Sequence, residues 1–317
     1  MDHVFPPHLS REEEKLVCDE IVSAFRKLPD DLQVIYLDKI SPLEQKILLE
    51  RNVISQSFLT APEKAVVVSD DWGLSAMINE EEHLRLAGMQ SGLCLEEVYQ
   101  RVDRIDSLLE ESLHYAAALD WGYLNTSLAS TGTGLRASVM LHFQGMVLDG
   151  KIDWVLKVAS ELGLQVKGYW AEGDNSLGSV YQVSNQHASG LSEREILIRV
   201  GKLVRKLADY ERASRDELLK KKKQELEDQV FRALGILKYC RLISSREAIE
   251  LLSSLRLGIS MGLLSEPSLE TVTALLILSQ KAHIQKNLEP SGDDTDNKLV
   301  DYTRAQMLRR GLEGQDV

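Results

Sequence analysis

Proline and cysteine are scarce in this sequence, and acidic residues outnumber basic ones. Of its 317 residues 7 are prolines and three are cysteines, Cys18, Cys94 and Cys240. An odd cysteine count without C-x-x-C spacing favours a reduced protein with ordinary thiols over a disulfide framework. The formal net charge of -12 argues against a broad surface for the phosphate backbone of nucleic acids. A local cationic pocket for a nucleotide is still compatible with this charge.

Long apolar runs are absent as well. The segment TALLIL, residues 273–278, is far shorter than a membrane span. The N-terminal residues MDHVFPPHLSREEEKL do not place an apolar stretch after a basic start, as a signal peptide would. We therefore expect a soluble, cytoplasmic protein with no membrane partner, folded as one large domain or as a larger and a smaller one.

The character of the sequence changes near Leu191. Before this point β-type runs alternate with helical spacing: a hairpin is predicted over 65–78, strands over 135–143 and 178–186, and helices over 93–119 and 150–163. After it the pattern is helical, with capping boxes at Ser192 and Ser244, a solvated lysine run at 220–223, an acidic linker over 289–298 and a last helix over 299–312. The sequence therefore predicts the α+β class with a helical C-terminal region.

The first candidate for chemistry is INEEEHLRL, residues 78–86. If the run begins a helix, its acids complement the helix dipole. If it is extended, Glu81, His83 and Arg85 lie on one face, about 7 Å apart at each step, while the other two glutamates point away and are structural or solvated. Such a row suits an anionic ligand beside an acid–base group, but the spacing does not choose between the two structures.

The second candidate is STGTGLRASVM, residues 130–140. Its glycines would let the backbone approach a phosphate, and Arg136 and Ser138 would point to one face of the following strand. A plain hairpin loop fits this segment equally well, since it matches neither the P-loop nor the G-x-G-x-x-G pattern.

The third candidate is VKGYWAEGDNSLGS, residues 166–179. Lys167 and Glu172 flank a glycine-containing segment that we expect to be a loop leading into the next strand. A functional loop and a plain surface loop are both open here.

Together these segments resemble the motifs of the ATP:guanidino phosphotransferases, most closely those of the McsB-type protein arginine kinases. INEEEHLRL resembles N-E-E-D-H-[LI]-R, GTGLRASVM resembles G-T-G-[LM]-R-A-S-V-M, and KGYWAEG followed by YQVSNQ resembles R-G-x-x-G-E-G followed by [IF]-x-[IV]-S-N. The similarity runs from about Phe5 to Arg310. The helical C-terminal region favours the protein kinase branch, whose phosphoarginine pocket has the motif R-D-x-x-R-A, and VDYTRA (300–305) resembles it.

The resemblance implies a large antiparallel sheet flanked by helices, glutamine-synthetase-like, over residues 1–218, without the S-x-R-x-R strand that would precede FPPHLS. A helical phosphoarginine-binding and dimerisation-like domain would follow over 219–317. The implied activity is transfer of the ATP γ-phosphate, with Mg²⁺, to arginine side chains of proteins in protein quality control. The implied partners are an McsA-type activator, a Clp-type chaperone and a second copy of the chain.

The resemblance also implies roles for single residues. Glu81 matches the carboxylate that orients and deprotonates the substrate guanidinium, and Glu172 matches a second acidic residue. Arg85 and Arg136 match arginines that bind the ATP phosphates. The other implied nucleotide contacts are Asn52, His83, Ala137, Ser138, Val139, Met140, Lys167 and Gly168, and the implied phosphoarginine pocket contains Asp301 and Arg304. These types suit the chemistry, since a protonated guanidinium is a poor nucleophile and needs a base, while cations stabilise the transferred phosphoryl group.

Several positions depart from the family patterns. The family's loop cysteine, proline and asparagine, a histidine near the nucleotide, the arginine of R-G-x-x-G-E and the first arginine of the C-terminal motif fall on Ser127, Leu128, Ser130, Asn52, Lys167 and Val300. Each lost charge-assisted hydrogen bond would weaken binding by roughly 1.5–3 kcal/mol. Two alternatives therefore stand beside the protein arginine kinase: an inactive relative that binds nucleotide or phosphoarginine as a regulator, and a small-molecule guanidino kinase.

Overall fold

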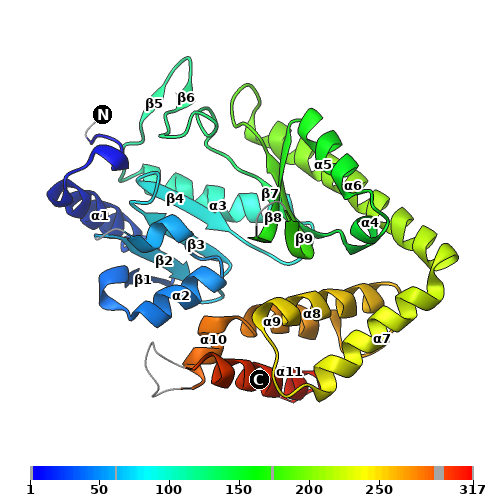
Figure 1. Cartoon of the computed structure of the whole chain (residues 1–317). Coiled ribbons are helices and arrows are strands. Elements are labelled where there is room, and N and C mark those ends of the chain that lie inside the picture. The colour runs from blue at the N-terminus through cyan, green and yellow to red at the C-terminus, as the bar shows by residue number, and fades with distance from the viewer. Residues whose placement is uncertain (1–2, 61–62, 173–174, 289–295, 316–317) are drawn as a thin grey trace. The chain divides into compact units, whose positions relative to one another are not determined.

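The computed structural model describes residues 3–60, 63–172, 175–288 and 296–315. The chain has the expected α+β class, with antiparallel strands in its first two thirds and, among the described residues, only helices after residue 192 (Figure 1). It divides into two compact units. Unit 1 comprises residues 1–137 and 185–201, and unit 2 comprises residues 138–184 and 202–317.

Unit 1 is built around a four-stranded antiparallel sheet with the order β1-β2-β3-β4. Its elements are α1 (Arg11–Phe25), β1 (Leu32–Tyr36), α2 (Pro42–Glu50), β2 (Ala65–Ser69), β3 (Leu74–Ile78), β4 (Leu84–Gly88), α3 (Leu95–Glu110) and the two-stranded pair β5 (Ala117–Ala118) and β6 (Gly122–Tyr123). The predicted hairpin over 65–78 is confirmed as β2 and β3.

Helices cover both faces of this sheet, so the middle strand β2 is buried at every position. Because side chains alternate along a strand, Ala65 and Val67 pack with α1 and α3, whereas Val66 and Val68 pack with α2 and Phe58 on the other face. Two hydrophobic clusters thus hold the sheet from opposite sides.

The helix expected over 93–119 ends at Glu110. Ala117 and Ala118 pair with Tyr123 and Gly122 instead, forming the β5–β6 hairpin. An alanine run has no apolar side chain large enough to hold it in a helix against the sheet, so strand pairing decides its structure here.

Unit 2 contains a three-stranded sheet with the order β7-β9-β8 and most of the helices. Its elements are β7 (Ser138–His142), α4 (Gln144–Leu148), α5 (Ile152–Glu161), β8 (Leu164–Glu172), β9 (Asn175–Asn185), α7 (Lys223–Tyr239), α8 (Ser245–Ser260), α9 (Leu269–Leu278), α10 (Lys281–Lys286) and α11 (Asn297–Leu312), while α6 (Glu193–Lys221) begins in unit 1. The expectation of a loop beginning at residue 166 was wrong, because residues 166–172 belong to β8. The neighbouring aromatic residues Tyr169 and Trp170 favour extended backbone.

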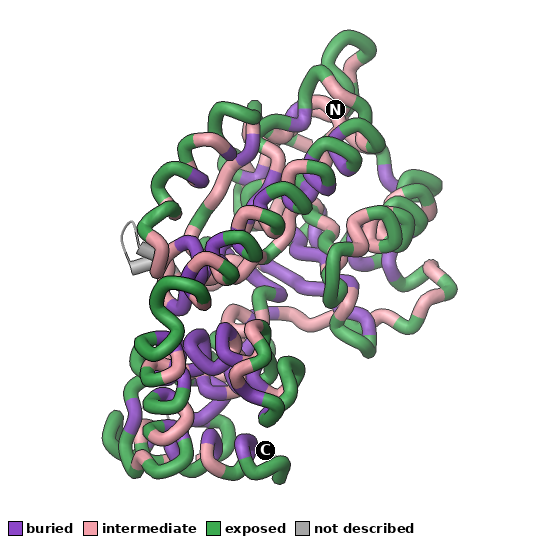
Figure 2. Tube along the Cα trace, turned by 90° about the vertical axis from the view of Figure 1, so that its right-hand side faces the viewer, coloured by how far each residue is buried: buried purple, intermediate pink, exposed green. Residues whose placement is uncertain are grey.

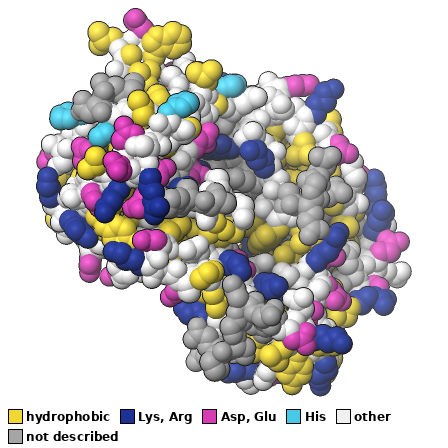
Figure 3. Space-filling view, turned by 60° about the vertical axis from the view of Figure 1, so that its left-hand side comes forward, with side chains coloured by type: hydrophobic (Ala, Val, Ile, Leu, Met, Phe, Trp, Pro, Cys, Tyr) yellow, Lys and Arg dark blue, Asp and Glu magenta, His cyan; other side chains and the backbone are white. Residues whose placement is uncertain are grey.

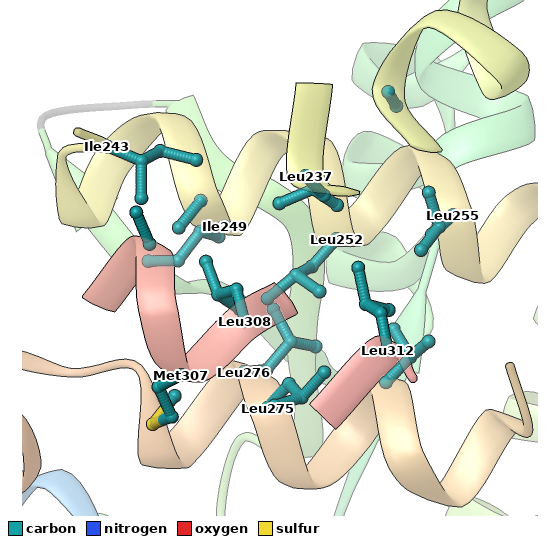
Figure 4. Close-up of a cluster of buried hydrophobic side chains, with 14 of the residues drawn as sticks. Leu237, Ile243, Ile249, Leu252, Leu255, Leu275, Leu276, Met307, Leu308 and Leu312 are labelled. Atoms are coloured by element: carbon teal, nitrogen blue, oxygen red, sulfur yellow. The ribbon is translucent and has the colours of Figure 1, made fainter. Parts of the chain in front are cut away.

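The C-terminal helices of unit 2 enclose one apolar core (Figure 4). Leucines from α7, α8, α9 and α11 meet there, and Figure 2 shows buried positions concentrated where these helices face each other. The lysine run is exposed and interrupts the helix at Lys222, and the predicted acidic partners are present for Lys221 and for Lys223, whose Nζ lies 3.7 Å from Glu227. Most of the predicted linker over 289–298 lies outside the described residues. No helix in the described part of the chain combines the length and apolarity needed to cross a membrane.

Of the two predicted capping boxes, the one at Ser192 is complete, whereas at Ser244 the described hydrogen bonds include only the half made by the serine hydroxyl. At Ser192 the capping box is reciprocal, with Glu195 accepting from the Ser192 N–H at 2.8 Å and the Ser192 hydroxyl accepting from the Glu195 N–H at 3.4 Å. At Ser244 the hydroxyl accepts from the Glu247 N–H at 3.2 Å. Both helices therefore begin where the sequence indicated.

Candidate active site

The glutamate run lies in a turn between β3 and β4. The expectation that it forms either a helix or a strand was wrong, because the strand begins only at Leu84. Asn79 has a left-handed backbone (φ 61°), its N–H donates to the His83 carbonyl at 3.0 Å, and the Glu80 N–H donates to the Glu82 carbonyl at 3.1 Å. The turn therefore points its side chains in different directions instead of alternating between two faces.

The side chain of Asn79 holds this turn against α1. Asn79 is buried, and its Nδ2 donates to the Glu14 carbonyl at 2.7 Å and to the Glu63 carbonyl at 3.4 Å. A buried amide that satisfies distant backbone carbonyls fixes the local conformation strongly. The position of the turn is thus set by residues up to 65 positions away.

Glu80 points into the protein, where its carboxylate accepts hydrogen bonds from neighbouring side chains. Its side chain is 5% exposed, and its carboxylate accepts from the hydroxyls of Ser55 at 2.6 Å and Ser57 at 2.7 Å. Arg85 donates to it at 3.4 Å. Burial alone would raise the pKa of Glu80, but these hydrogen bonds and the charge of Arg85 outweigh it and lower the pKa. Glu80 therefore stays ionised as a structural anion.

Glu82 holds a neighbouring loop. Its two carboxylate oxygens accept the backbone N–H groups of Thr126 at 2.9 Å and Ser127 at 3.2 Å. The expectation that Glu80 and Glu82 are structural is confirmed, although strand alternation was the wrong reason for it. Ser127, which replaces the family's loop cysteine, is thus fixed through its backbone.

Glu81 differs from both neighbours. Its side chain is exposed, and in the described part of the chain it makes none of the hydrogen bonds or ion pairs that occupy Glu80 and Glu82. An exposed carboxylate held on a rigid turn can accept a hydrogen bond from an incoming cationic group without breaking an existing contact. Of the three glutamates, Glu81 is the one that can meet a ligand.

His83 faces the N-terminal segment. Its Nε2 lies 2.8 Å from the Val4 carbonyl, so Nε2 carries the proton and donates. Burial lowers the pKa of His83, and the Val4 bond opposes that effect only in part. The ring also contacts the ring of His3 edge to face at 6.3 Å. His83 is therefore engaged by the chain itself on the side of its Nε2.

Two arginines lie within each other's electrostatic field in unit 1. Partial desolvation lowers the pKa of Arg136, although the residue is exposed, and the positive charge of Arg85 lowers it further. Arg85 comes from β4 and is half-exposed, while Arg136 precedes β7. Cations that repel each other are stabilised by an anion placed between them. The two arginines predicted to bind phosphate are thus near enough for the charge of one to affect the other.

Gly132, which precedes Arg136, serves the protein's own packing. Gly132 has φ 119°, and a Cβ there would lie 2.8 Å from the Ala188 carbonyl oxygen, so no side chain fits. The Gly132 N–H and carbonyl pair with the backbone of Tyr123 at 3.1 and 2.8 Å. Between the two structures left open by the sequence, Gly132 fits the hairpin loop, because the backbone that approaches it closely belongs to the chain.

Asn185 is a positioning residue that the sequence analysis did not single out. Its Oδ1 accepts from the Ala137 N–H at 2.8 Å, and its Nδ2 donates to the Leu135 carbonyl at 3.0 Å. The backbone on each side of Arg136 is therefore fixed by one side chain. The signal was present in the sequence, since Asn185 is the asparagine of YQVSNQ.

The remaining predicted nucleotide contacts are spread over both units. Asn52 follows α2 with a left-handed backbone and an exposed side chain, and Ala137 is buried. In unit 2 the Ser138 hydroxyl accepts from Gln182 at 3.1 Å. The other predicted contacts lie on strands: Val139 and the exposed Met140 on β7, Lys167 and Gly168 on β8. Glu172 ends β8, and its side chain lies outside the described residues.

In the C-terminal helices Arg304 is 2% exposed and contacts the protein on several sides. Its Nε donates to the Ser279 carbonyl at 2.7 Å, and its Nη1 donates to the Ile243 carbonyl at 2.7 Å and to Asp301 at 2.5 Å. Val300, where the motif has its first arginine, is buried in the apolar core. The position of the missing arginine is therefore filled by a core side chain.

Comparison with known proteins adds to this geometry. Residues 14–214 match the family described as ATP:guanido phosphotransferase, C-terminal catalytic domain. The chain belongs to this family. Residues 223–316 match a second description, Protein-arginine kinase McsB C-terminal domain. Both matches agree with the family resemblance of the motifs.

Relatives of this guanido phosphotransferase are similar over nearly its whole length. The chain is similar to a protein-arginine kinase from Clostridium kluyveri (strain ATCC 8527), with 40% identity over 97% of this chain and 90% of that protein. It is similar to a protein-arginine kinase from an Exiguobacterium species, with 36% identity over 98% of this chain and 89% of that protein.

Solved structures agree on the fold. A lombricine kinase structure is 28% identical, with a TM-score of 0.57 over 66% of this chain and 62% of that one. The duplicated taurocyamine kinase from Schistosoma mansoni with bound transition state analogue components is 21% identical, with a TM-score of 0.62 over 78% of this chain and 36% of that one, which shows the fold alone.

Proposed function

We propose that this chain transfers the γ-phosphate of ATP to arginine side chains of proteins. The observation that carries the proposal is the turn at residues 79–83, where Glu81 alone among three glutamates is exposed and uncommitted. The protein-arginine kinase relatives and the match to the McsB C-terminal domain support a protein substrate. They favour neither the small-molecule kinase nor the inactive regulator.

The proposed reaction assigns one role to each group. The Glu81 carboxylate accepts a hydrogen bond from the substrate guanidinium, orients it and takes one of its protons as the nitrogen attacks the γ-phosphorus. A phosphorus–nitrogen bond forms, the bond from the γ-phosphorus to the bridging oxygen breaks, and ADP leaves. Arg85 and Arg136 stabilise the charge on the phosphates. Glu172, Asn52, His83, residues 137–140, Lys167 and Gly168 are proposed further contacts on the strength of the motifs alone.

We propose that Mg²⁺ enters with ATP. Among the described residues, no three side chains of the types His, Cys, Asp and Glu form a group suited to a metal. Mg²⁺ retains waters and binds phosphates with few carboxylates. An ion carried by the nucleotide would therefore need few ligands from the protein. The ion would neutralise phosphate charge there.

The wider proposal rests on the family resemblance. Residues 1–218 would form the catalytic domain, and 219–317 a helical domain that binds phosphoarginine through Asp301 and Arg304 and supports a homodimer. The protein would act in the cytoplasm with an McsA-type activator and a Clp-type chaperone.

Transfer of radiolabel from γ-³²P-ATP to an unfolded arginine-rich protein tests the function. We expect an acid-labile product, and Glu81→Gln should lower kcat at least about 100-fold, because a positioned general base contributes 10²–10⁴-fold. Glu161→Gln, at an exposed acid that ends α5, is the matched control and should keep full activity. Absence of transfer by the unaltered protein, or full activity of Glu81→Gln, would refute the proposal. Turnover of free arginine without protein labelling would instead identify a small-molecule kinase.

A further inference from the structure

Unit 1 has a pocket that the proposed chemistry does not use. It lies between the C-terminal end of α3, the β5–β6 hairpin and the start of α6. Four carboxylates line it, from Glu110, Asp120, Glu193 and Glu195, and the described lining includes no Lys or Arg. The pocket therefore presents negative charge to whatever enters it.

Aromatic and apolar side chains accompany this charge. Tyr115 and Tyr123 contact each other edge to face at 6.0 Å, and both line the pocket with Trp121. Trp121 is 69% exposed, and the neighbouring Leu119 projects fully into solvent. Hydrophobic side chains are visible at the top of the view in Figure 3, where the hairpin lies. Large exposed apolar groups of this kind mark interaction sites.

The electrostatic environment of Tyr123 agrees with a negative pocket. Its hydroxyl donates to Glu110 at 2.7 Å, and this bond raises the pKa of Tyr123 well above its usual range. Burial and the charges of Glu110, Asp106 and Glu193 raise it further. Each of these acids disfavours a second negative charge and favours a positive one.

The pocket shares one chain segment with the candidate active site. Gly122, Gly132 and Thr133 line it, and the same segment contains Thr126, which Glu82 fixes, and continues to Arg136. A polypeptide bound along this segment would thus contact residues that line the pocket and residues that continue to the candidate active site.

We propose that this pocket docks the polypeptide whose arginine is phosphorylated, by receiving a second cationic side chain, Arg or Lys, together with a neighbouring apolar residue. The inference rests on the proposed function. Carboxylates pair with the cation, while Trp121 and the tyrosines pack on its aliphatic stem and on the apolar neighbour. Charge complementarity of this kind selects partners and speeds their association.

Binding can be measured without any phosphate transfer. The probe is a fluorescent peptide of Lys, Leu, Trp and Ser that lacks arginine, followed by anisotropy at low salt. The double variant Asp120→Asn, Glu193→Gln and the single variant Trp121→Ala should each weaken binding at least about 5-fold, and 0.5 M salt should weaken it further. Glu161→Gln is the matched control. These sites leave the Glu195 cap and the Glu110 bond intact. Equal affinity of the double variant and the unaltered protein would overturn the proposal.

Kinetics then connect the pocket to the reaction. Two peptides are compared, one with a single arginine and one with the same arginine flanked by Lys and Leu. The unaltered protein should show a lower KM for the flanked peptide, and the double variant should lose this preference while retaining kcat on the single-arginine peptide. An unchanged preference in the double variant would overturn the docking site. Probe binding without phosphorylation of either peptide would instead overturn the proposed function and leave the cation-binding pocket supported.

Discussion

Replacing Glu82 by alanine should release the loop at Thr126 and Ser127 while the sheet of unit 1 stays folded. The Glu82 carboxylate accepts both backbone N–H groups, at 2.9 and 3.2 Å. Such charge-assisted bonds contribute roughly 1.5–3 kcal/mol each when they are shielded from water. All three residues are only half-buried, so water would replace part of the loss. We expect local opening to become easier by about 1–2 kcal/mol, a factor of roughly 5–30.

Amide hydrogen exchange measures this opening residue by residue. The Thr126 and Ser127 amides should exchange roughly 5–30 times faster in Glu82→Ala. The Tyr123 and Gly132 amides, which bond to each other's carbonyls, should keep their rates. In the proposed reaction kcat/KM should fall by a similar factor, because this loop leads to the segment that we propose binds phosphate.

Glu81→Ala is the matched control, since Glu81 is an exposed neighbour in the same turn. It should leave all four exchange rates unchanged. Unchanged exchange at Thr126 and Ser127 in Glu82→Ala would refute the reasoning, because the two bonds would then contribute nothing. Equal acceleration at Tyr123 and Gly132 would also refute it, because the loop would not be opening locally.

Three further predictions concern stability. Arg304→Met should lower the free energy of unfolding by roughly 3–5 kcal/mol, because buried carbonyls lose their donor. Arg304→Lys should lower it by less. Equal melting temperatures for Arg304→Met and the unaltered protein would contradict this prediction. Burial and nearby arginines lower the pKa of His142 from 6.5 to about 3. Below about pH 6.5 the unfolded state therefore binds a proton at this histidine that the folded state does not bind. The free energy of unfolding should then fall by roughly 1 kcal/mol for each pH unit. In urea titrations at pH 7 and pH 5, His142→Gln should reduce this fall and the exposed control His8→Gln should not; an identical pH dependence in His142→Gln would refute it. Gly132→Ala should lower the free energy of unfolding by more than about 2 kcal/mol, because its Cβ would meet backbone atoms. Gly134→Ala should lower it by only about 1 kcal/mol, because Gly134 also has positive φ but its Cβ would meet only the Asn125 side chain at 4.0 Å. Equal thermal shifts would argue against the packing explanation.

Much of the fold could be predicted because its signals are local. The β2–β3 hairpin has a polar turn between apolar runs, and the helices after residue 192 begin at capping serines. The failures came where the local residues suit two structures equally well. The alanine run continues the helical spacing of α3, but it pairs with β6, four to six residues further along the chain. The glycine-containing segment over 166–172 suits a loop, but it forms β8, whose neighbour β9 begins at residue 175.

In the candidate site the contacts that decide the structure are distant in sequence. The three glutamates are identical as letters, and only their surroundings separate them: Ser55 and Ser57 bind Glu80, whereas Thr126 and Ser127 bind Glu82. These contacts span 23 to 45 positions, so no local periodicity could reveal them. The family motif indicated the segment, and long-range hydrogen bonds decide what each carboxylate is free to do.

Asn185 places a limit on when the candidate site can form during synthesis. Arg136 leaves the ribosome 49 residues before the side chain that fixes the backbone on both of its sides. A nascent chain ending before residue 185 can complete the β1–β4 sheet but cannot hold Arg136 in place. If Arg136 binds phosphate as we propose, that capacity should be acquired late, only after β9 has been made.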